Sequence, residues 1–115
     1  MNDAVTAEDV RGYLGRDLDD LYALLVPPED KELYSRGGLI ARGQSILRAR
    51  AEAIRRVACP QRAANLDSVD LGVLIATSLA ADPALGRLPA LPLAAILLKV
   101  GLDSFCDSGE HGGLV

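Results

Sequence analysis

The densest group of residues able to do chemistry in this sequence is a run of arginines in the middle of the chain. Residues 36–62 hold seven arginines and one glutamate, whereas the segments on both sides are acidic and the formal net charge is -4. Basic residues supply nucleic-acid affinity by neutralising phosphates. On helices they also commonly form salt bridges with acids of the same chain or of a partner. The run is therefore open to three interpretations: a phosphate contact, an acidic protein partner, or a solvated helix face.

The rest of the composition favours a protein partner over a nucleic acid. Sites for nucleic acids usually combine basic residues with stacking aromatics, and no aromatic lies between Tyr34 and Phe105. The acidic net charge also argues against a dedicated polyanion binder. We therefore predict a partner-binding face on one helix, formed by Arg42, Arg48, Arg50, Arg55 and Arg56. Arg62 continues the same run beyond that helix.

Other reactive residue types are few and scattered. A nucleophile needs a base held within hydrogen-bond reach, and the only histidine, His111, lies between glycines near the end of the chain. Cys59, Cys106 and His111 lack the closely spaced cysteine pairs that are typical of structural zinc sites. The sequence therefore predicts no catalytic residue, no metal site and no cofactor, and hence no enzyme.

The cysteines and the hydropathy pattern bear on location. Two cysteines in 115 residues do not make the dense disulfide framework of small secreted domains. We expect them to be reduced and buried as small apolar side chains. The acidic N-terminus does not resemble a signal peptide, and the apolar stretch 88–102 is shorter than the about 20 residues that span a bilayer. These features predict a cytoplasmic protein that does not enter the membrane.

Apolar residues at three- and four-residue steps predict helices in the first half of the chain. Thr6, followed by acids, is typical of a helix N-cap, and the stripe behind it predicts one helix to Leu25. The prolines at 27 and 28 end it. A second helix follows, in which Gly37-Gly38 either breaks the helix after Tyr34 or lets another helix approach closely. Residues 38–58 form its best-defined part.

The second half predicts two more helices. Asp67 and Ser68 are typical caps of a third helix that ends before Asp82, and Pro92 opens a fourth that is apolar nearly all round. These two helices belong in the centre of the molecule. We therefore predict an all-α fold, a compact bundle of four to five helices over residues 1–106, with a flexible glycine-rich tail at 107–115.

One short pattern resembles a known family. Leu66-Asp67-Ser68-Val69, and again residues 101–105, resemble the Asp-Ser-Leu attachment motif of acyl and peptidyl carrier proteins, which are small acidic four-helix bundles. The resemblance implies a phosphopantetheine arm on Ser68. In that family the serine precedes acidic helical sequence, whereas the helix after Ser68 is nearly uncharged. A serine or aspartate at a helix start is also an ordinary cap.

Taken together, these features predict a non-enzymatic protein-protein interaction module: an adaptor, an accessory subunit or a self-associating bundle. It is expected to dock through apolar helix faces and the arginine-rich helix. Two alternatives remain open, namely a nucleic-acid-associated regulator that uses the same arginines and a carrier-like protein modified at Ser68. No small-molecule substrate is evident from the sequence.

Overall fold

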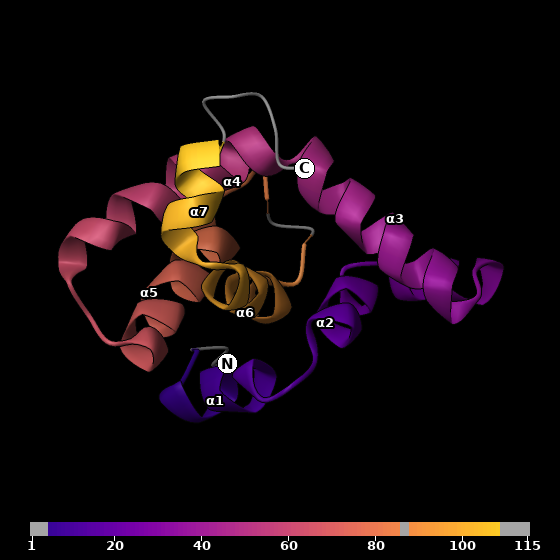
Figure 1. Ribbon diagram of the computed structural model, residues 1–115, viewed down its shortest axis with the longest axis horizontal. Helices are drawn as coiled ribbons and strands as arrows, with labels where there is room; N and C mark the ends of the chain where they lie inside the picture. The colour runs from indigo at the N-terminus through magenta and orange to yellow at the C-terminus, as the bar shows by residue number, and fades with distance from the viewer. Residues whose placement is uncertain (1–4, 86–87, 109–115) are drawn as a thin grey trace.

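The computed structural model describes residues 5–85 and 88–108, and within these ranges the chain forms helices and no strand (Figure 1). The predicted all-α class is confirmed, and the radius of gyration of 13.4 Å is that of a compact domain of this length. The elements outnumber the predicted four to five helices. In chain order they are α1 (Ala7–Leu14), α2 (Leu18–Leu24), η1 (Pro28–Leu33), α3 (Arg36–Ala49), α4 (Ala51–Ala58), η2 (Cys59–Ala64), α5 (Ser68–Ala81), α6 (Ala90–Val100) and α7 (Leu102–Ser108).

The first predicted helix is two helices. Its start is confirmed, because Thr6 forms a capping box in which its hydroxyl accepts from the Asp9 backbone at 3.1 Å. The continuous helix to Leu25 is wrong, since α1 ends at Leu14 and the backbone of Asp17 is extended before α2 begins. The apolar stripe keeps its three- and four-residue steps across the break, so its spacing could not reveal it. The Lys99 ammonium donates to the Leu14 carbonyl at 3.0 Å and satisfies the end of α1.

The second predicted helix is broken at two places. η1 ends after Leu33, and α3 begins behind Ser35, whose hydroxyl accepts from the Gly38 backbone at 3.2 Å. The break after Tyr34 was one of the two predicted alternatives, and Gly37-Gly38 lie in the first turn of α3. A further break at Arg50, where φ is -108° and ψ is 8°, divides the segment 38–58 into α3 and α4.

The close helix approach that glycine allows lies at Gly43 rather than at Gly37-Gly38. A Cβ atom at Gly43 would lie 1.9 Å from the carbonyl oxygen of Tyr22, whereas one at Gly37 would meet nothing within 4 Å. The backbones of α2 and α3 are therefore in direct contact. Figure 1 shows these two helices side by side, with α3 extending away from the rest of the molecule.

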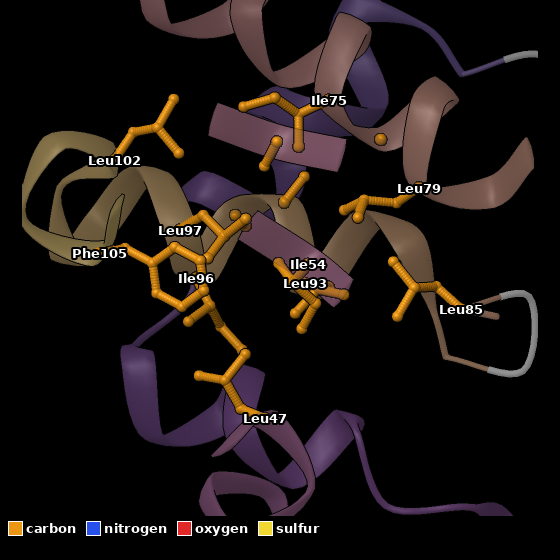
Figure 2. Close-up of a cluster of buried hydrophobic side chains, with 14 of the residues drawn as sticks. Leu47, Ile54, Ile75, Leu79, Leu85, Leu93, Ile96, Leu97, Leu102 and Phe105 are labelled. Carbon is orange, nitrogen blue, oxygen red and sulfur yellow. The ribbon is translucent and has the colours of Figure 1, made fainter. Parts of the chain in front are cut away.

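The centre of the molecule is α6, as predicted. Residues 92–97 are all buried, and α6 packs against α1, α2, α5 and α7. Figure 2 shows Leu93, Ile96 and Leu97 of α6 among side chains from α3, α4, α5 and α7. The helix begins at Ala90, two residues before Pro92, which is tolerated in the first turn because no intrahelical bond needs its missing N–H there. α5 packs beside α6 and is capped by Asp67, as predicted.

A last helix, α7, was not predicted. It follows Gly101, whose φ of 98° favours glycine, and it buries Leu102, Phe105 and Cys106. The predicted tail begins at residue 107, but α7 continues through Ser108. Residues 109–115, which include His111, lie outside the described residues. The sequence did not predict α7 because it is only seven residues long.

Candidate binding groove

The described surface contains a groove between α2, η1, α3 and the connection from α5 to α6. Its volume is about 680 Å³. Its lining is mixed, since it includes the buried Leu25 and Val26 and the prolines Pro27, Pro28 and Pro89 beside four charged residues. The other lining residues are Leu24, Glu29, Lys31, Arg42, Ser45, Ile46, Ala49, Arg50 and Leu88.

One face of α3 forms a wall of this groove. Arg42, Ser45, Ile46 and Ala49 recur at steps of three and four, which places them on one side of the helix. Gly43 and Leu47 lie on the neighbouring side of α3 and are buried. The helix therefore packs against the molecule with one stripe and leaves the neighbouring stripe open to the groove.

The rim of the groove is mostly basic. Arg42 and Arg50 are exposed, and Lys31 lies on the η1 side next to Glu29. Neither Arg42 nor Arg50 forms a side-chain hydrogen bond or ion pair with another residue of the described ranges. Within those ranges their guanidinium groups therefore have no anionic partner.

The structure does not bring the five predicted arginines onto one face. Arg42 and Arg50 line the groove, and Arg48 lies on α3 outside it, close enough to Tyr22 to act on its ionisation. Arg56 is exposed on α4. Arg55 points the other way and is held by α7. The break at Arg50 divides the predicted helix into α3 and α4, so the five arginines come from two helices and the residue between them rather than from one continuous helix.

The interface between α2 and α3 is closely packed and also contains charged side chains. Arg36 at the start of α3 forms an ion pair with Asp20 of α2, which raises the pKa of the guanidinium. Burial raises the pKa of the Tyr22 hydroxyl, and Asp19 raises it further, while the positive charge of Arg48 partly opposes both. Arg36 is not one of the arginines of the predicted face, and no ion pair joins those arginines to α1 or α2 within the described residues.

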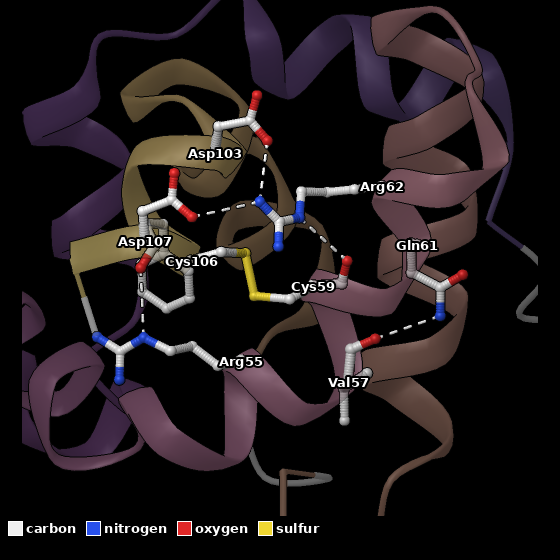
Figure 3. The surroundings of a disulfide bond; sticks show 9 residues. Arg55, Val57, Cys59, Gln61, Arg62, Asp103, Cys106 and Asp107 are labelled. Atoms are coloured by element: carbon white, nitrogen blue, oxygen red, sulfur yellow. Dashed lines mark hydrogen bonds and ion pairs between the residues drawn. A yellow bond between two sulfur atoms is a disulfide. The ribbon is translucent and has the colours of Figure 1, made fainter. Parts of the chain in front are cut away.

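Arg55 and Arg62 belong to a second region, the disulfide corner, which joins α4 and η2 to α7 (Figure 3). Its centre is a disulfide between Cys59 and Cys106, whose Cα atoms are 5.9 Å apart. Arg62 forms ion pairs with Asp103 at 3.1 Å and with Asp107 at 3.5 Å. Arg55 donates to the Phe105 carbonyl at 3.3 Å, and its guanidinium carbon lies 5.0 Å from the centre of the Phe105 ring.

This pairing corrects the interpretation of the cysteines as reduced. No cysteine in the described residues is free. Disulfides persist mainly in oxidising compartments, so the cysteines no longer support a cytoplasmic location. The interpretation failed because Cys59 and Cys106 lie 47 positions apart and are brought together only when α7 folds back over η2.

The remaining candidates from the sequence lie apart from one another. Asp67 is engaged as the cap of α5, where it accepts from the Asp70 backbone at 2.9 Å, and Ser68 is exposed at the first position of that helix. No group of three or more potential metal ligands occurs among residues 5–85 and 88–108. Over the same ranges, none of the helices has the length and apolar character needed to cross a membrane.

Sequence reasoning missed most of the groove. Ile46 belongs to the predicted apolar stripe, but that stripe gave no reason to place it at an opening rather than in the core. Leu88 and Pro89 reach the groove from a distant segment that was predicted only as a connector. The paired prolines at 27 and 28, which follow the end of α2 and line the groove, were the one available signal.

No model of a known protein family, no curated protein and no solved structure matches this chain. Its function must therefore be argued from its own geometry.

Proposed function

We propose that this chain is a non-enzymatic protein interaction module that docks a partner in the groove between η1, α3 and the α5–α6 connection. The observation that carries the proposal is the groove itself, which combines apolar lining residues with Arg42 and Arg50, whose guanidinium groups have no side-chain partner among the described residues. Apolar contact supplies affinity when water is displaced, and charged groups at the rim supply orientation and association rate.

The exposed apolar side chains near the groove support the same function. Leu33, at the end of η1, has 73% of its surface exposed, and the neighbouring Tyr34 has 38%. Single exposed apolar residues are common in proteins. Here they follow in the chain the η1 residues Glu29 and Lys31, which line the groove, and they add exposed apolar surface to the same segment.

The test is quantitative capture with three matched baits: the wild-type chain, the Arg42→Glu and Arg50→Glu double variant, and Arg56→Glu as a control. All three arginines are exposed, so the fold is expected to survive, and far-ultraviolet dichroism checks this. We expect at least one protein from the source lysate to bind the wild type and the control but to be lost from the double variant. Light scattering on the same samples tests whether a second copy is the partner.

A monomeric chain that captures the same proteins with all three baits contradicts docking in the groove. Nucleic acid is the competing partner for the same arginines, and it predicts binding that falls steeply with salt. A mobility shift at low salt that disappears in the double variant would replace the protein partner by a nucleic acid.

A further inference from the structure

We propose that the occupant of the groove is an acidic amphipathic helix of a partner protein. This inference rests on the proposed function and names the chemistry of the partner. It follows from three features of the groove: the spacing of its α3 wall, the charges among its lining residues and the half-buried apolar side chains that also line it.

The wall has the length and the periodicity of a helix-binding surface. Lining residues from Arg42 to Arg50 extend over eight steps, which correspond to about 12 Å along a helix axis. Between these ends, Ile46 and Ala49 present apolar surface and Ser45 a small side chain. A helix lying along α3 would place its own side chains into this surface at three- and four-residue steps, as helices in apolar grooves do.

The rim requires acids on the partner. The four charged lining residues are three cations and one anion, Glu29, which lies two positions from Lys31 on the η1 side. Along the α3 side, both charged residues are arginines. A partner helix therefore needs carboxylates on the edge that faces α3, and these must be about 12 Å apart, which corresponds to about seven or eight residues of a helix.

The side of the partner helix that lies between these carboxylates must be apolar. Leu24, Ile46 and Leu88 are half-buried and line the groove. The prolines at 27, 28 and 89 have no backbone N–H with which to bind an extended peptide. Strand addition needs a row of free backbone donors and acceptors, which this boundary does not offer. A helix satisfies its own backbone and presents only side chains, so it is the form of peptide that suits a groove with these walls.

The experiment selects a display library of randomised helical peptides on the immobilised, oxidised full-length chain. We expect the enriched peptides to carry two acids about seven or eight positions apart, with apolar residues at the intervening three- and four-residue steps. Binding of an enriched peptide should weaken more than about tenfold in the Arg42→Glu and Arg50→Glu double variant. It should recover when the peptide's two acids are replaced by lysines.

Two further variants separate this inference from the proposed function. Ala49→Trp fills the groove without changing its charge, and Arg56→Glu reverses an exposed charge outside it. Peptides that Ala49→Trp blocks but that lack the paired acids, or that bind the double variant unchanged, overturn the acidic helix and leave docking in the groove intact. If no peptide is enriched, or if Ala49→Trp blocks none of them, both the inference and the proposed function fail.

Discussion

Arginines from one short stretch of chain have opposite roles in two regions of this molecule. At the disulfide corner, Arg55 and Arg62 bind the carbonyl of Phe105 and the carboxylates of Asp103 and Asp107. At the groove, the side chains of Arg42 and Arg50 bind no other residue of the described ranges and share the lining with apolar residues. The side-chain chemistry is the same, so the difference comes from what the fold places opposite each arginine.

The comparison teaches that the density of charge in a sequence does not locate a binding surface. The corner uses its arginines to hold α7 on the body of the protein, whereas the arginines at the groove hold no other element of the described residues. A substitution at the corner should therefore change stability and leave binding alone, and a substitution at the groove should do the reverse.

The largest expected effect is loss of the disulfide. The Cys59–Cys106 bond closes a loop with a sequence separation of 47, and its removal should lower the free energy of unfolding by about 4 kcal/mol through the entropy of the unfolded chain. Chemical denaturation of the wild type with and without dithiothreitol measures this loss. The Cys59→Ser and Cys106→Ser double variant is the control, since reductant should not change its midpoint.

Alkylation of the chain inside cells tests the same bond together with location. A paired Cys59 and Cys106 are protected from the reagent, and a cytoplasmic chain kept reduced would be labelled at both.

A denaturation midpoint that does not respond to reductant after both thiols have been released would show that the stability of the corner does not depend on this bond.

The next effect is at the close backbone contact between α2 and α3. Gly43→Ala places a Cβ atom against the Tyr22 carbonyl, and because backbone cannot rotate away as a side chain does, α2 and α3 must separate. We expect a loss of about 2 kcal/mol or more, as for other overpacked sites. Gly37→Ala is the control in the same helix, where the added methyl group meets open space. Equal denaturation midpoints for the two variants would contradict the close contact.

The smallest effect compares two adjacent arginines. Arg55→Ala removes a hydrogen bond to Phe105 and a cation–π contact, and should lower the free energy of unfolding by about 1 kcal/mol. Arg56→Ala changes an exposed side chain and should stay within about 0.5 kcal/mol of the wild type. Neither should affect an occupant of the groove. If Arg55→Ala weakens binding as strongly as the reversal at Arg42 and Arg50 does, the division between corner and groove is wrong.

Local sequence was a good guide to the helices and a poor guide to their breaks. The Thr6 and Asp67 caps, the all-α class and the central position of α6 were predicted correctly, because caps and apolar stripes depend on residues within a few positions of one another. The breaks at residues 15–17 and at Arg50 were missed, since the apolar steps continue through them. α7 was missed because seven residues carry too little periodicity to be read.

What the sequence determined by itself is therefore the set of helices that this chain favours and the sides of them that must be covered. The tertiary structure alone decided that Cys59 meets Cys106, that Gly43 lies against Tyr22, and that Leu88 lines the same groove as Ala49. Each of these pairs joins residues far apart in the chain. Their pairing depends on how the helices pack, which no short window of sequence specifies.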